Sequence, residues 1–226
     1  MAPSSKGSRG PIHDLEKIYD RVRADSRWDH LRAPGARLVP GFGPLRPMAM
    51  IVGEAPGATE NTLGRPFCGA AGRVLEGLME SAGLWAEPKW SHGSEKFPET
   101  TGEVPPNAYL TNVVKYRPMG NRTPTPDEIT WGTETLRAEW VALGSPRLIV
   151  AVGTVAKVAL LSAAGGPGEM LRSIRSMSPG NVVWRGGAWI YAQYHPAFGL
   201  RQPNMRPVME QQWEAMGKWM ISSGEF

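Results

Sequence analysis

The sequence predicts an α/β fold in which helices cover both faces of a parallel sheet. Four short apolar stretches alternate with segments of helical periodicity, as expected for parallel strands joined by crossover helices. The first of these strands precedes a long loop rich in glycine and proline. Open sheets of this class place their ligand sites after the carboxyl ends of strands. We therefore expect a functional site at that edge of the sheet.

Length and composition indicate one soluble domain. We expect residues 11–226 to form it, behind a flexible tail at residues 1–10 that lacks the apolar core of a signal peptide. Apolar residues make up 41% of the chain, and no apolar run approaches membrane-spanning length, which predicts a soluble protein. Cys68 is the only cysteine, so an internal disulfide is excluded. The formal charge of +4 permits nucleic-acid binding without requiring it.

In the N-terminal half, apolar spacing predicts a helix over residues 12–22 and the apolar face of another over 74–82. Between them, the unbroken apolar run at 48–52 predicts a buried strand. The proline- and glycine-rich residues 30–47 are expected to form an irregular lead-in to this strand. The polar residues 85–106 are expected to form an insertion loop.

The middle of the chain predicts a second strand at 108–114 and then a long helix. Thr125 and Glu128 form a capping box, with Pro126 at the first helical position, and this signature marks a helix start. Gly144 marks the helix end.

The C-terminal part predicts a third strand at 148–152, a helix at 154–161, a fourth strand at 189–194 and a last helix over 209–220. Residues 165–181 are expected to be loosely structured. Polar or glycine-rich segments follow these strands. Because the carboxyl ends of parallel strands meet at one edge, we expect these segments to gather there.

Several segments match one protein family in order, from about residue 48 to the C-terminus. GEAPG at 53–57, Glu60, GRPF at 64–67 and GAAG at 69–72 resemble motif 1 of the family 4 uracil-DNA glycosylases. YHPAFGLR at 194–201 resembles motif 2. Further matches are TNVVKYRP at 111–118, NRTPTPDEI at 121–129 and AVGTVAKVALL at 151–161. The resemblance implies a three-layer α/β/α sandwich, here with a central four-stranded parallel sheet.

The resemblance also implies roles for three pocket residues. Phe67 matches the aromatic residue that stacks on the flipped base, and a flat ring suits any pyrimidine. Asn112 matches the residue that reads uracil, because a carboxamide offers a donor and an acceptor to N3–H and O4. His195 matches the residue that stabilises negative charge on the departing base. Without the motifs, these residues would suit a core ring, a strand cap and a surface histidine.

Two acidic residues of motif 1 have less defined roles. Glu60 matches the position that crowds C5 of the pyrimidine and rejects thymine, and the alternative is a solvated loop carboxylate. The resemblance implies that Glu54, the acidic residue of motif 1, orients water or stabilises a sugar cation. A related family has an activating aspartate one position later, where this chain has Ala55. Hydrolysis is then expected to rely more on electrostatics than on proton abstraction.

Other residues suit contacts with DNA. The helix beginning at Thr154 offers free N–H groups to an anion. Phe198 and Leu200 suit a wedge that enters the base stack as the base leaves. The remaining candidates are basic side chains for phosphates: Arg65, Lys115, Arg117, Arg122 and Arg201.

The chain departs from family 4 at the iron–sulfur cluster. That family holds a [4Fe–4S] cluster on four cysteines, whereas Tyr116 replaces one of them here, Gly132 lies near another, and the N-terminal pair is absent. We expect no cofactor and no metal, with packing by Tyr116, the capping-box helix and the tryptophans in place of the cluster. Such cluster-free relatives occur in phages.

The expected function is a monofunctional, monomeric uracil-DNA glycosylase acting on single- or double-stranded DNA in bacterial or phage-infected cytoplasm, with no membrane partner. Two alternatives stay open. The first is a glycosylase for another modified pyrimidine. The second is a catalytically idle DNA-binding protein with the same fold. A nicotinamide-binding protein is excluded because no GxGxxG follows the first strand.

Overall fold

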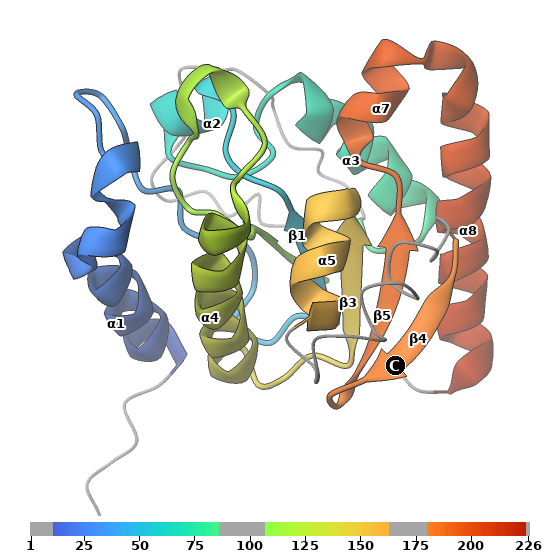
Figure 1. The fold of residues 1–226 in the computed structure, drawn as a ribbon. Coiled ribbons are helices and arrows are strands. Elements are labelled where there is room, and N and C mark those ends of the chain that lie inside the picture. The colour runs from blue at the N-terminus through green and yellow to red at the C-terminus, as the bar shows by residue number, and fades with distance from the viewer. Residues whose placement is uncertain (1–10, 86–106, 163–179, 225–226) are drawn as a thin grey trace, which may run out of the picture.

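A computed structural model describes residues 11–85, 107–162 and 180–224. They form a five-stranded sheet in the order β2-β1-β3-β5-β4 (Figure 1). The strands β1 (Ala49–Gly53), β2 (Ala108–Asn112), β3 (Leu148–Val152) and β5 (Ala188–Gln193) are parallel. They correspond to the four predicted strands. The α/β class with a parallel centre is thus confirmed.

The fifth strand corrects the predicted strand count. β4 (Val182–Arg185) pairs antiparallel with β5 at the sheet edge. The connection is a two-residue turn at Gly186 and Gly187, whose φ angles are 58° and 97°. Both angles are in the left-handed region, as a tight hairpin turn requires. A Gly-Gly pair between two apolar runs is a hairpin signal that was available in the sequence.

Helices cover both faces of the sheet (Figure 1). On one face, α1 (Pro11–Ala24), α4 (Pro126–Ala142) and α5 (Thr154–Ser162) pack into one hydrophobic cluster. On the other face, α3 (Ala70–Ser81) and α8 (Arg206–Ser223) pack into a second cluster. All residues of β1, β2 and β3 are buried, which explains the unbroken apolar runs of β1 and β3.

Local signals position the start of α4. The Thr125 hydroxyl accepts a hydrogen bond from the Glu128 backbone N–H at 3.3 Å. In return, the Glu128 carboxylate accepts one from the Thr125 N–H at 2.7 Å. The predicted capping box is confirmed, with Pro126 at the first helical position.

Several short helices lie between the longer elements. They are η1 (Ser26–Leu31), α2 (Ala58–Leu63), η2 (Met119–Asn121), α7 (Pro196–Arg201) and η3 (Pro203–Met205). The predicted tail at residues 1–10 and nearly all of the predicted loops at 85–106 and 165–181 lie outside the described residues. Within the described part of the chain, no helix has both the length and the apolarity needed to cross a membrane.

Candidate active site

A cavity of about 700 Å³ opens at the carboxyl edge of the sheet. Its walls come from the loops after β1 and β3, the end of β2, the α4 lead-in and the β5–α7 connection. This is the edge at which the sequence predicts a site. The predicted residues that line the cavity are Glu54, Glu60, Phe67, Asn112, Arg122, Thr154, His195, Phe198 and Arg201.

Phe67 and Asn112 meet over the end of β1. A Cβ atom on Gly53 would lie 2.4 Å from Asn112 Oδ1 and 2.5 Å from Phe67 Cζ. The glycine therefore leaves the space that the ring and the carboxamide occupy. Phe67 has a φ of 54°, a strained backbone angle for a large residue, and its side chain is buried. Asn112 is 4% exposed, so hydrogen bonds that it forms in the cavity face little competition from water.

The Glu60 carboxylate spans the loop between β1 and α3. Its two oxygens accept hydrogen bonds from the Gly57 N–H at 3.1 Å and the Gly69 N–H at 3.0 Å. These contacts join the two ends of the loop that carries Phe67. Glu60 is thus partly buried and hydrogen-bonded to the backbone, which differs from the solvated loop carboxylate of the alternative interpretation.

His195 is held as a neutral hydrogen-bond donor. Its Nδ1 accepts a hydrogen bond from the Ala197 N–H at 3.2 Å at the start of α7, so the ring proton resides on Nε2. Burial, together with the positive charge of Arg201, lowers the pKa of His195 to about 4. At neutral pH the imidazole is therefore uncharged. A Cβ atom on Gly153 would lie 3.0 Å from the His195 Cβ, so this glycine gives the ring its place.

Glu54 and Arg201 contribute opposite charges to the same cavity. Burial raises the pKa of the Glu54 carboxyl, and the positive charge of Arg201 opposes that rise. A carboxylate held between a low-polarity wall and a cation can orient a water molecule or stabilise a nearby positive centre.

Four polar residues of the cavity lining are not among the predicted site residues: Asn121, Lys157, Gln193 and Tyr194. Gln193 is 3% exposed, and neither polar atom of its carboxamide has a hydrogen-bond partner in the described protein. Gln193 lies level with Asn112 across the sheet. Asn112 pairs with Gly53 at the end of β1, and Gln193 pairs with Val152 at the end of β3, the strand next to β1. A polar residue at the end of an apolar strand was the available signal for Gln193.

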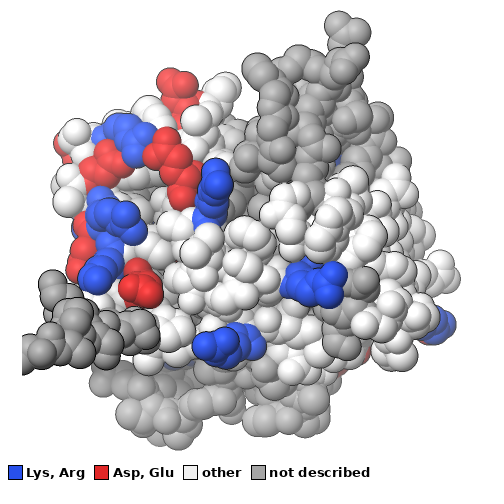
Figure 2. Space-filling view, turned by 90° about the horizontal axis from the view of Figure 1, so that it is seen from below, with Lys and Arg blue, Asp and Glu red and all other residues white. Residues whose placement is uncertain are grey.

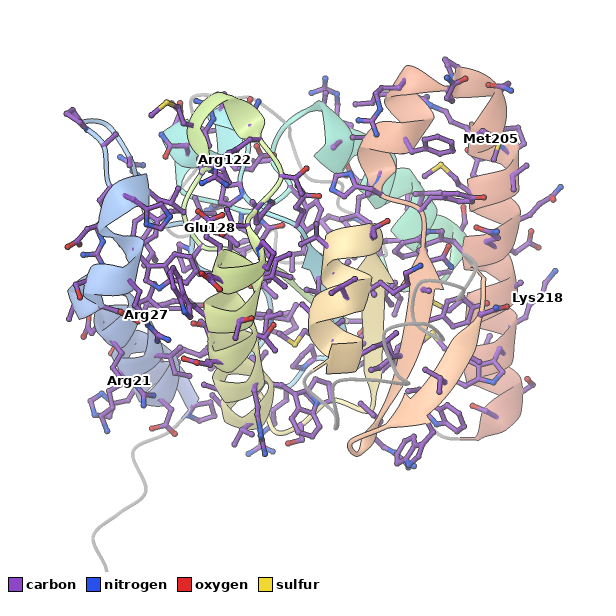
Figure 3. All side chains as sticks on the ribbon, in the orientation of Figure 1. Arg21, Arg27, Arg122, Glu128, Met205 and Lys218 are labelled. Carbon is purple, nitrogen blue, oxygen red and sulfur yellow. The ribbon has the colours of Figure 1, made fainter. Side chains whose placement is uncertain are left out.

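The predicted phosphate contacts differ in their surroundings. Arg122 donates to both oxygens of Glu128 at 2.7 and 2.8 Å, and Figure 3 shows the two side chains turned toward one another. The Arg117 Nε donates to Asn121 Oδ1 at 2.7 Å, beside a separate cavity of about 290 Å³. The Arg65 guanidinium lies 4.5 Å from the centre of the Phe42 ring. Neither Arg117 nor Arg65 lines the main cavity.

The predicted wedge is divided between the cavity and its outer surface. Phe198 lines the cavity and stacks on Tyr194, with ring centroids 5.1 Å apart. Leu200 is 39% exposed and does not line the cavity. Thr154 lies at the start of α5 and lines the cavity, and its role at a helix N-terminus that receives an anion stays a prediction.

The prediction that Lys115 contacts phosphate is wrong. Its side chain is 1% exposed, and its ammonium forms a salt bridge with Glu139 at 2.7 Å. Burial lowers the pKa of Lys115, while Glu139 opposes that effect. A lysine enclosed in this way cannot reach solvent or DNA. The sequence signal of a basic residue after a strand did not distinguish a surface charge from a buried one.

Tyr116 and Gly132, the residues predicted to lie at one family-4 cysteine position and near another, do not fit an iron–sulfur cluster. Tyr116 is buried, with the Arg32 guanidinium 5.5 Å from its ring centre. A Cβ atom on Gly132 would lie 2.4 Å from the Val113 carbonyl oxygen, so no side chain fits there. Cys68 is the one thiol in the sequence, and burial raises its pKa to about 12. A cluster of this kind needs four thiolates.

Figure 2 shows the edge of the molecule opposite the cavity. There the visible acidic and basic side chains intermingle at one side, and the other basic residues are isolated. Among the described residues in this view, no continuous basic surface forms. A polyanion would therefore gain little from this edge.

The sequence matches the model of the uracil DNA glycosylase superfamily over residues 40–217. It is 32% identical to the type-4 uracil-DNA glycosylase of Pyrobaculum aerophilum, over 85% of this chain and 88% of the relative. The type-4 enzyme of Sulfurisphaera tokodaii is 32% identical, over 93% and 87%. A type-5 uracil-DNA glycosylase of Thermus thermophilus is 34% identical, over 71% and 69%. The family match, the sheet topology and the cavity agree: this chain belongs to the uracil DNA glycosylase superfamily.

Proposed function

We propose that this protein is a monofunctional uracil-DNA glycosylase of base excision repair. It would flip uracil out of DNA and hydrolyse the N-glycosidic bond, leaving an abasic site. The observation that carries the proposal is the convergence of the Asn112 carboxamide, the Phe67 ring and a neutral His195 in one cavity. The names of the relatives, all uracil-DNA glycosylases, support the same activity.

Asn112 and Phe67 recognise the flipped base. The Asn112 amide donates to uracil O4 while its carbonyl oxygen accepts from N3–H, a pairing that cytosine reverses. Phe67 stacks on the base. Glu60, hydrogen-bonded across the loop, holds the Phe67 segment and crowds C5, where thymine carries a methyl group.

Bond cleavage depends on the departing base. As the C1′–N1 bond breaks, its electron pair moves onto the uracil ring and negative charge grows on O2. The His195 Nε2–H donates to that oxygen, and because the imidazole starts neutral, no proton transfer is required. A water oxygen then bonds to C1′ and loses its proton to solvent, with Glu54 orienting the water and stabilising the sugar cation.

DNA binding uses the rim of the cavity. Arg201 and Lys157 supply positive charge, the N-terminus of α5 at Thr154 receives a phosphate, and Phe198 with Leu200 enters the space left by the base. The proposed substrate is uracil in single- or double-stranded DNA, bound by a cytoplasmic monomer. The protein would be a cluster-free relative of family 4, without a cofactor.

Gln193 favours a second candidate, a glycosylase for another modified pyrimidine. Its buried carboxamide has no partner in the described protein. A polar substituent on the pyrimidine could satisfy that group, whereas uracil alone has fewer polar atoms to offer.

One assay tests both candidates and the alternative of an inactive protein. Oligonucleotides bearing uracil, thymine, hypoxanthine or 5-hydroxymethyluracil are incubated with the protein, and abasic sites are detected by alkaline cleavage. We expect cleavage at uracil and none at thymine. Cleavage only at 5-hydroxymethyluracil would establish the second candidate. Absence of cleavage in all four, by protein that still binds DNA, would refute catalysis.

A further inference from the structure

The buried Lys115 lies at the centre of a hydrogen-bond network behind Asn112. Its ammonium donates to the Asn112 backbone carbonyl at 2.6 Å, to the Glu139 carboxylate at 2.7 Å and to the Thr111 hydroxyl. An ammonium has three N–H donors, and these three acceptors use all of them. The Lys115 ammonium therefore has all of its donors paired only in this one position.

The partner carboxylate is equally enclosed. Glu139 is 0% exposed, and its oxygens accept from the Thr111 hydroxyl at 3.2 Å and from the Tyr19 hydroxyl. The Tyr19 hydroxyl also lies 2.9 Å from that of Tyr109 and accepts from the Gly41 N–H at 2.7 Å. The network therefore joins α1, α4 and the segment before β1 to the end of β2.

The other side of the β2 end is held by backbone hydrogen bonds to β1. The Val113 N–H donates to the Gly53 carbonyl at 2.9 Å, and the Val114 N–H donates to the Glu54 carbonyl at 3.1 Å. Asn112 therefore lies between two sets of contacts, one from its strand neighbour and one from Lys115. Its carboxamide projects from this point to Phe67 and the cavity.

We propose that Lys115 and Glu139 are positioning residues that set the orientation of the Asn112 carboxamide for base recognition. This inference rests on the proposed function, because it assigns the pair to the same site. A buried ion pair is a weak source of stability, since desolvation offsets much of the attraction. It is instead a directional contact, and a displacement of about 1 Å at a site of this kind can reduce activity about 100-fold.

The test compares Lys115→Met in two backgrounds. In the parent chain, we expect kcat/KM for uracil excision under single-turnover conditions to fall about 10- to 100-fold. In the Asn112→Ala background, the same substitution should change kcat/KM less than about 2-fold. The reason is that the effects of substituting two residues, one of which acts through the other, do not add. Equal losses in both backgrounds would show a merely structural role and refute the proposal. So would an unchanged rate in the parent background.

A matched control is available on α8. Lys218 and Glu214 form an ion pair at the same 2.7 Å separation, but their side chains are 74% and 53% exposed. Figure 3 shows Lys218 pointing away from the molecule. Lys218→Met should leave excision and its dependence on Asn112 unchanged. A comparable loss from Lys218→Met would contradict the assignment to the buried pair.

Two further measurements keep the test decisive. If Lys115→Met does not fold, Lys115→Met combined with Glu139→Met removes both charges, and the same two-background comparison applies. If the parent does not excise uracil, the proposed function fails, and calorimetric binding of free uracil replaces the rate. Loss of uracil affinity that disappears in the Asn112→Ala background supports positioning; loss that persists, or no loss, refutes it.

Discussion

The two walls of the cavity are built differently. On the β2 side, Asn112 is buried, and its backbone is held by Lys115 and by β1. On the β5 side, His195 begins α7, which has six residues, and Arg201 at its end is exposed. The wall assigned to recognition is therefore embedded in the sheet. The wall assigned to chemistry is formed by a short helix whose last residue is exposed, where DNA must also bind.

The two walls therefore meet different structural requirements, one for base recognition and one for bond cleavage. Reading a base by hydrogen bonds requires donor and acceptor positions that do not shift, and a buried network supplies them. Stabilising charge on a leaving group requires a donor in a low-polarity position, which burial of His195 supplies without a second network. Substitutions on the two walls should therefore have different effects on uracil-DNA binding and on excision.

The largest effect is expected on the β2 wall. Asn112→Asp replaces the amide donor with a carboxylate, which repels uracil O4 and leaves a matched hydrogen bond unmade. Uracil excision should fall by about two to three orders of magnitude. Single-turnover rates on a uracil oligonucleotide measure this. A rate equal to that of the parent would remove Asn112 from base recognition.

On the β5 wall, His195→Ala should slow excision about 100-fold while uracil-DNA binding changes little. The reason is that the imidazole contacts charge that develops only as the bond breaks. Fluorescence anisotropy measures binding beside the rate. If binding weakens as much as excision, His195 acts on the ground state, and the division between the walls fails.

Phe67→Ala should weaken binding and excision together, each about 5- to 100-fold, because stacking acts before and during bond cleavage. Its position over Gly53 makes it part of the β2 wall. A folded variant, checked by thermal unfolding, that loses rate without losing affinity would place Phe67 with His195 instead.

Salt dependence distinguishes surface from buried charge. Arg201→Ala should reduce the slope of log K against log salt by about one, as expected for one lost phosphate contact. Lys115→Met should leave that slope unchanged because the ammonium is enclosed. A reduced slope for Lys115→Met would contradict its buried position.

The smallest effect is an expected absence of change with pH. The neutral form of His195 is the donor, and its pKa of about 4 keeps it neutral across the range in which an ordinary histidine titrates. Excision should stay flat from about pH 8 to about pH 6, with no bend near the usual histidine pKa of about 6.5. A bend there that His195→Ala abolishes would show that the imidazole is not buried in solution.

The same pKa affects stability. Between about pH 6.5 and pH 4, the unfolded chain binds a proton at His195 that the folded chain does not. The contribution of His195 to the free energy of unfolding is therefore complete above about pH 6.5 and is lost as the pH falls toward 4. His195→Ala should flatten that part of the stability curve, measured by denaturant unfolding.

The sequence predicted the parallel strands and the edge of the sheet at which the site lies, because apolar runs and strand-following motifs report burial and topology directly. It did not predict β4, whose four residues are too short for a periodic signal. Lys115 was placed on the surface because its burial depends on Glu139, 24 residues later. Gln193 was missed although it is a polar residue at the end of an apolar strand, because its lack of hydrogen-bond partners is visible only in the structure.

Two glycines leave space for side chains of the site. Gly53 and Gly153 lie at the ends of neighbouring strands, and each lacks a side chain where a functional side chain packs. A systematic substitution scan would therefore score both positions as sensitive as Asn112 or His195, although neither glycine has a side chain to offer a substrate. In this fold, intolerance to a single added methyl group marks where a functional side chain packs against the main chain, and any attempt to graft the site onto another sheet must transfer those two glycines along with the reactive residues.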